Sequence, residues 1–196
     1  MNKNLSIKDL IVTGVFSAII FICICLTGGV LAIMPALTFY YPVGASLLAG
    51  PVFLLMLAKV PKRGPILISG LLMAIFCFAT GMHWAMCLGY IIGGVIAELV
   101  SGSKDYRSKR MNIAAYIIFC IGGSGSYLAY FISPATWISG MLEGGTPQEY
   151  LDTMRASTHW WVLVTMLCGT VLVALLSGIV GSKLLKKQFE KAGITA

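Results

Sequence analysis

The chain has 196 residues, of which 58% are hydrophobic and only 11% are charged. A soluble globular domain carries roughly 25% charged residues, and disordered chains are polar, so the composition excludes both classes. The net charge is +7, from 14 Lys and Arg against 7 Asp and Glu. We therefore expect an integral membrane protein that forms a single domain over residues 1–196.

Long uncharged stretches predict six transmembrane helices, because about 20 helical residues cross the hydrocarbon core of a bilayer. Glycine and proline residues at 28–42 divide the first stretch, and the sequence at 80–83 divides the second. Residues 111–142 are long enough for one span and a proline-broken outer segment. We expect an all-α bundle with spans at residues 9–27, 36–58, 64–80, 83–101, 111–133 and 159–185.

The positive charges gather on one side of this predicted bundle. Of the 14 Lys and Arg residues, only Arg155 falls on the other side. Because cytoplasmic loops are rich in Lys and Arg, we expect both termini in the cytoplasm, the loops 28–35, 80–83 and 134–158 outside, and a multi-pass protein of the plasma membrane. The cytoplasmic set is Lys3, Lys8, Lys59, Lys62, Arg63, Lys104, Arg107, Lys109, Arg110, Lys183, Lys186, Lys187 and Lys191.

The first 32 residues have the basic start and apolar run of a signal peptide. The run is long and five further spans follow, so we expect it to stay as the first span. All six cysteines lie inside predicted spans without a CxxC pair, which indicates neither a disulfide framework nor a zinc site. We expect no metal bound by the protein itself and no intrinsic cofactor.

Small residues four apart mark faces on which membrane helices approach closely. Such pairs on the fourth, fifth and sixth predicted spans favour packing within the bundle. On the first span, Gly14 and Ala18 lie near the cytoplasmic end, where a helix of another protein is an equal candidate for the contact.

No GxxxxGK[ST] loop is present, so we do not expect this chain to hydrolyse ATP. Glu98 lies near the cytoplasmic end of the fourth predicted span. We expect its carboxylate to reach the interface and to pair with Lys or Arg of residues 102–110. A buried functional carboxylate is the alternative.

Two His-Trp pairs open the fourth and sixth predicted spans on the outer side. Aromatic residues of the second and fifth spans lie at the same level. The simplest interpretation of these Trp and Tyr residues is an aromatic belt at the membrane–water interface. Histidine is not a belt residue, so we expect a shared cavity for a flat conjugated ligand, with imidazoles for hydrogen bonds or haem iron. The candidate binding residues are Met82, His83, Trp84, Met86, His159, Trp160, Trp161, Tyr40, Tyr41 and Tyr130.

The long outer loop contains a helix signal. Thr146, Pro147 and Glu149 fit a capping box that predicts a short helix over residues 147–156. Its apolar residues could form a lid over a ligand site, and a static helix on the membrane surface has equal weight. The lid residues would be Tyr150, Leu151 and Met154.

Several short strings support a resemblance to a known family: residues 8–11 followed by Gly14-Val15-Phe16-Ser17-Ala18, residues 58–64, and Gly81-Met82-His83-Trp84. With these strings the whole chain resembles a substrate-binding S component of an energy-coupling factor (ECF) transporter, of the Trep_Strep or MptD type. The resemblance implies a six-helix subunit that captures a micronutrient outside the cell. It implies docking through the first helix, at Gly14 and Ala18, onto a transmembrane T subunit that carries two ATPase subunits.

The ligand stays open at this point. Haem is the first hypothesis, a pterin-, flavin- or nucleobase-like molecule the second, and a small aliphatic vitamin the third. Rival classes are a stand-alone carrier or channel, a scaffold without ligand, and an intramembrane serine protease. The protease hypothesis rests on the GxSG string at residues 122–125. The predicted positions oppose it, because Ser124 lies near mid-membrane and His159 at the outer mouth, too far apart for a nucleophile and its base.

Overall fold

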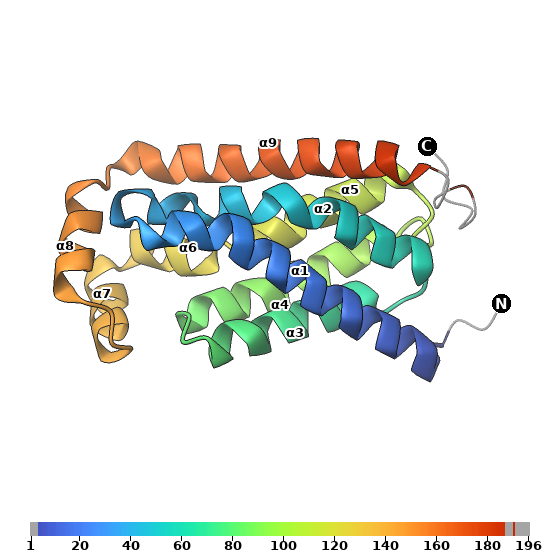
Figure 1. The fold of residues 1–196 in the computed structure, drawn as a ribbon, viewed down its shortest axis with the longest axis horizontal. Coiled ribbons are helices and arrows are strands. Elements are labelled where there is room, and N and C mark those ends of the chain that lie inside the picture. Colours follow the sequence, from blue (N-terminus) through green and yellow to red (C-terminus); the bar gives the residue numbers. More distant parts are fainter. Residues whose placement is uncertain (1–3, 187–189, 191–196) are drawn as a thin grey trace.

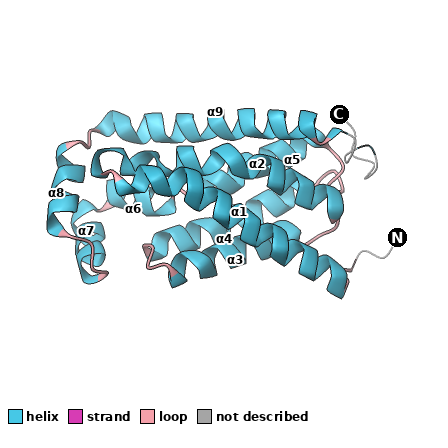
Figure 2. Cartoon of the chain, viewed as in Figure 1, coloured by secondary structure: helices cyan, strands magenta, loops and turns pink. Residues whose placement is uncertain are grey.

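The computed structural model describes residues 4–186 and residue 190, and the regular elements of this part of the chain are helices joined by short loops (Figure 2). The long helices lie side by side along one axis, while two short helices stand across one end (Figure 1). In chain order they are α1 (Ile7–Ile33), the 3-10 helix η1 (Pro35–Tyr40), α2 (Tyr41–Lys59), α3 (Pro65–Ala79), α4 (Trp84–Gly102), α5 (Lys109–Gly122), α6 (Gly125–Ile132), α7 (Pro134–Glu143), α8 (Gln148–Ala156) and α9 (Trp160–Leu184).

The described chain begins and ends at the same end of the bundle (Figure 1), which we call the terminal end. The α2–α3 and α4–α5 loops also lie there. The opposite end, which we call the distal end, carries the α3–α4 turn, α7 and α8.

The described helices include four that are long and apolar enough to cross a membrane: α1, residues 35–59, α4 and α9. A fifth span results if α5 and α6, which are bent by 49°, are taken together. Helix α3 is apolar but has only 15 residues, about 22 Å at 1.5 Å per residue. The structure therefore supports an all-helical membrane protein with four or five candidate spans, where the sequence predicts six.

Two predicted boundaries differ from the structure because glycines serve close packing there. Helix α1 continues through Gly28 to Ile33, although a loop is expected at 28–35. A Cβ at Gly28 would lie 2.9 Å from the Tyr41 carbonyl oxygen, so this glycine lets α2 approach. The fifth predicted span, 111–133, is divided into α5 and α6 around Gly123 and Ser124.

Small residues hold the bundle together, as the sequence predicts for its later helices. The backbones of Gly89 and Gly93 on α4 contact Gly122 on α5 so closely that no Cβ would fit between Gly89 and Gly122. On the other side of the bundle, Gly181 of α9 lies against Pro51 of α2. Apolar side chains in lipid are already out of water, so the hydrophobic effect does not bring membrane helices together. They associate through close backbone contact at small residues instead.

Glu98 is buried inside the terminal end, so the expectation of an interfacial pair with Lys or Arg is wrong. Only 6% of the residue is exposed. Its carboxylate accepts hydrogen bonds from the amides of Gly64 (2.7 Å), Ile66 and Leu67 (3.0 Å each) and the hydroxyl of Tyr106 (2.5 Å). The first amides of α3 have no partner within their own helix, and Glu98 supplies one from α4.

Tyr106 completes this connection from the α4–α5 loop. Burial, and then the hydrogen bond to Glu98, raise the pKa of its phenol well above the usual value, so it stays a donor. The chain reverses at this point with a positive φ of 51° at Asp105 and 60° at Tyr106. One carboxylate thus joins both loops of the terminal end.

Candidate ligand site at the distal end

An open pocket of about 650 Å³ lies at the distal end, between the α3–α4 turn and α7. This volume falls in the range of 300–1,000 Å³ that is usual for small-molecule sites. Polar and apolar side chains both contribute to the walls. The lining residues are Gly81, Met82, His83, Trp84, Ala135, Thr136, Ser139, Gly140, Met141, Glu143, Gly144 and Thr146.

Helix α7 presents one polar face to the pocket. Thr136, Ser139, Gly140 and Glu143 are separated by three, four and seven residues, which places them on the same side of a helix. The Ser139 hydroxyl donates to the Glu143 carboxylate at 3.5 Å, so this carboxylate keeps most of its acceptor capacity. The α7 wall therefore offers hydroxyl groups and one negative charge.

Trp137 holds α7 in place from the side of the helix next to this polar face. Its indole is 4% exposed and donates a hydrogen bond to the Ser126 hydroxyl of α6 at 3.0 Å. The ring also packs edge-on against Tyr130, with centroids 5.4 Å apart. A buried indole and its partner thus fix the orientation of the polar face.

His83 forms the opposite wall, where it caps the N-terminus of α4. Its Nδ1 accepts a hydrogen bond from the Ala85 amide at 3.2 Å. Burial lowers the pKa of the imidazole, so the ring is neutral at pH 7. A neutral imidazole that accepts through Nδ1 carries its proton on Nε2. Nε2 faces α7, because a Cβ at Gly140 would lie 3.7 Å from it.

Trp84 and Met82, two of the predicted binding residues, complete that wall. The rings of His83 and Trp84 lie 5.4 Å apart with 33° between their planes. Trp84 is 61% exposed. A flat molecule can stack against this exposed indole while it faces α7.

The second histidine lies elsewhere, so the structure does not form the expected cavity shared by two histidines. His159 stacks on Trp161, with centroids 6.1 Å apart, and is not among the residues that line the pocket. Trp160 and Trp161 are 79% and 45% exposed. These exposed rings at the start of α9 fit the aromatic-belt alternative.

The remaining candidate residues are not part of the pocket lining. Met86, Tyr41 and Tyr130 are buried, and Tyr130 packs against Phe39 of η1 at 5.0 Å. The hydroxyl of Tyr40 is hydrogen-bonded to that of Thr165 on α9 at 3.0 Å. These residues build the aromatic core of the distal end and do not line the pocket.

The predicted lid helix exists as α8, but it covers η1 and the end of α1. Leu151 and Met154 are fully buried, and the Tyr150 hydroxyl donates to the Ala32 carbonyl at 2.5 Å. The N-cap is Pro147 without a side-chain bond, so the expected capping box is not formed. Thr146 lines the pocket instead. These contacts fit the static-helix alternative.

Helix α7 lines the pocket, and the sequence analysis did not predict it as a helix. The pair Ser133-Pro134 carries the signal, because proline favours the first position of a helix and serine the cap. The polar residues at positions 136, 139 and 143 that follow are spaced as on one helix face. A helix assignment there would have predicted the second wall of the pocket.

The model of the Trep_Strep family, described as a hypothetical bacterial integral membrane protein, matches residues 7–191. The chain belongs to the Trep_Strep family. No curated protein and no solved structure matches the chain significantly. Membership agrees with the apolar helices of the structure and identifies this Trep_Strep protein as an integral membrane protein.

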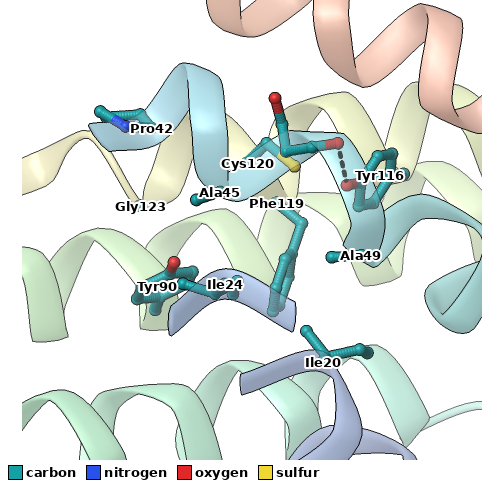
Figure 3. Close-up of a pocket in the computed structure, with 11 residues that line it drawn as sticks. Ile20, Ile24, Pro42, Ala45, Ala49, Tyr90, Tyr116, Phe119, Cys120 and Gly123 are labelled. Atoms are coloured by element: carbon teal, nitrogen blue, oxygen red, sulfur yellow. Dashed lines mark hydrogen bonds between the residues drawn. The ribbon is translucent and has the colours of Figure 1, made fainter. Parts of the chain in front are cut away.

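A second, internal cavity of the Trep_Strep protein lies between α1, α2, α4 and α5 (Figure 3). Its volume of about 10 Å³ corresponds to roughly one water molecule. Beside it the Tyr116 hydroxyl donates to the Ser46 carbonyl at 2.7 Å, which is the dashed line in Figure 3. This cavity is too small for a cofactor, so the distal pocket is the candidate ligand site.

The GxSG string of the Trep_Strep protein lies in the break between α5 and α6. Ser124 is fully buried, and its hydroxyl has no hydrogen-bond partner among the described residues. A serine nucleophile needs a base within about 3 Å. His159 stacks on Trp161 at the start of α9 and does not supply one.

Proposed function

We propose that this Trep_Strep protein is the solute-capturing membrane subunit of an ECF-type importer, an S component in the plasma membrane. The observation that carries the proposal is the open pocket at the end opposite the basic loops and both ends of the described chain. If the positive-inside rule orients the bundle, the pocket faces the outside and receives solute there. Helix α3 then serves as the sixth, short span.

Helix α1 supports the partner part of the proposal. Only 22% of its most apolar window is buried, against 61% for residues 35–59. A Cβ at Gly14 would meet nothing within 4 Å, so this small residue faces away from the bundle. Together with the partly exposed Ala18, it offers a smooth strip for a helix of the T subunit. Two ATPase subunits would supply the energy, and we assign no catalytic residue to this chain.

For the ligand we propose a flat aromatic micronutrient or cofactor. Trp84 and His83 provide the stacking surface, and α7 provides polar contacts. Haem remains a candidate cargo, with His83 as the one histidine of the pocket. Iron ligation through Nε2 would require the proton to move to Nδ1, and the hydrogen bond from the Ala85 amide would be lost.

Co-purification and uptake test the proposal. The full chain should co-purify with a T subunit and two ATPases, and uptake in cells should stop when the ATPases are inactivated. Gly14→Leu should abolish co-purification, because a large side chain would fill the contact strip. Gly29→Leu is the matched control, since Gly29 also lies on α1 with open space around it. Uptake that persists without any ATPase would establish a stand-alone carrier instead.

A further inference from the structure

We propose that the distal pocket selects a flat nitrogen heterocycle that carries an amino group beside a ring N–H, with Glu143 accepting from this edge and His83 donating to a carbonyl or ring nitrogen. The inference rests on the proposed capture function and specifies the ligand class of that same site. It places opposite hydrogen-bonding roles on the two walls of the pocket.

The His83 wall supplies a donor of fixed direction. The Ala85 amide occupies Nδ1 at 3.2 Å, so the neutral ring has only the Nε2 proton to offer. A ligand atom that hydrogen-bonds to Nε2 from the pocket must therefore be an acceptor. A carbonyl oxygen or an unprotonated ring nitrogen meets this requirement.

The α7 wall supplies a carboxylate. Glu143 lines the pocket, and its contact to the Ser139 hydroxyl is long, at 3.5 Å. A carboxylate has two oxygens that accept a pair of parallel N–H donors, as in its pairing with guanidinium groups. An amino group next to a ring N–H presents the same pair in one plane.

The charge of the distal end favours a neutral or cationic ligand. The sequence between α6 and α9 has a net charge of −2. It contains three acidic residues and one basic residue: Glu143, Glu149, Asp152 and Arg155. A cleft with negative charge attracts cations and repels anions. Ligands with phosphate groups or several carboxylates are therefore disfavoured, and porphyrins with two propionates belong to this group.

Binding of two pteridines to the purified full chain in nanodiscs tests the inference. Pterin has a 2-amino group and a 4-carbonyl, and lumazine replaces the amino group with a second carbonyl. Pterin should bind about tenfold more tightly or better, measured by calorimetry, because lumazine would place an acceptor against the carboxylate. Glu143→Gln should weaken pterin binding by about tenfold or more and remove the preference. Asp152→Asn is the matched control, because it removes a charge at the same end outside the pocket.

Equal binding of both pteridines, no binding of either, or an unchanged pterin affinity in Glu143→Gln would overturn the inference. A haem complex with a shifted Soret band that disappears in His83→Ala would also overturn it, in favour of iron ligation. Co-purification with the T subunit and ATPases is measured on the same preparation. If the partners are present and pterin does not bind, the ligand class is wrong while the capture function stands.

Discussion

The indole of Trp137 on α7 donates a hydrogen bond to the hydroxyl of Ser126 on α6 across 3.0 Å. This bond joins the wall of the candidate site to a helix of the bundle. Helix α7 lies across the distal end (Figure 1), and Ser139 and Glu143 on this helix line the pocket. The position of Glu143 and Ser139 therefore depends on a contact that another residue of their helix makes with the bundle.

Trp137→Phe should weaken ligand binding several-fold while the bundle stays folded. The change removes the indole donor and leaves the buried Ser126 hydroxyl without this partner, at a cost of about 1–2 kcal/mol. Calorimetric titration and thermal unfolding in detergent measure the two effects. Trp160→Phe is the control, because Trp160 is 79% exposed and should affect neither. Unchanged binding in Trp137→Phe would show that α7 does not need this anchor.

Acidification should weaken both the distal end and its ligand binding through His83. Burial lowers the folded-state pKa of His83 below the usual value of about 6.5. At a pH between the two pKa values the unfolded chain binds more protons, so stability rises with pH there and falls as the pH drops below about 6.5. Protonation also removes the Nδ1 acceptor for the Ala85 amide.

Ligand affinity measured from about pH 7.5 down to about pH 5 checks this dependence. His83→Gln should flatten the profile, and His159→Gln should leave it as in the wild type, since His159 lies outside the pocket. If the profile changed in His159→Gln and not in His83→Gln, the titrating group would lie outside the pocket, and this prediction would be wrong.

Glu98→Gln should destabilise the protein by about 3 kcal/mol, because one carboxamide cannot replace a carboxylate that accepts four hydrogen bonds. The new NH2 group would face an amide donor. Thermal unfolding should show a large fall for Glu98→Gln and a smaller one for Tyr106→Phe. Glu190→Gln serves as control, since its side chain is 62% exposed. Equal stability of all three would mean that Glu98 does not hold the loops together.

Gly122→Ala should separate α4 from α5. The added Cβ would lie 2.5 Å from the Gly89 carbonyl oxygen, which is backbone and cannot rotate away. We expect a loss of about 1–3 kcal/mol from this overpacking. Gly29→Ala adds the same methyl group into open space and should change the unfolding temperature little. Similar unfolding temperatures for the two variants would contradict the close packing of these helices.

The sequence predicts the helical membrane class and close packing at small residues of the fourth and fifth spans, because hydropathy and small-residue spacing reflect the bilayer as solvent. In the structure Gly89 and Gly122 make this contact. It predicts Met82, His83 and Trp84 as binding residues, and these three residues line the distal pocket. The rest depends on tertiary contacts. Gly28 resembles a break in the sequence, yet α1 continues there, since α2 packs on it.

His159 shows why the shared cavity could not be predicted. Two His-Trp pairs at helix starts are equivalent in sequence, but only the helix that stands opposite each pair decides whether it lines a pocket. Helix α7 faces His83, while His159 stacks on Trp161. The burial of Glu98 could not be predicted for the same reason, because its partners Gly64 and Ile66 lie more than 30 residues away in the sequence.

Labelling of intact cells with a membrane-impermeant maleimide tests the central claim, that the distal pocket opens to the outside. Ser139→Cys places a thiol in the pocket wall, and Lys104→Cys places one in the α4–α5 loop of the terminal end. The six native cysteines, four of them partly or fully buried, give the background, which the wild type measures. We predict rapid labelling of Ser139→Cys and labelling of Lys104→Cys only after the membrane is opened. Labelling of Lys104→Cys in intact cells with protection of Ser139→Cys would contradict the account.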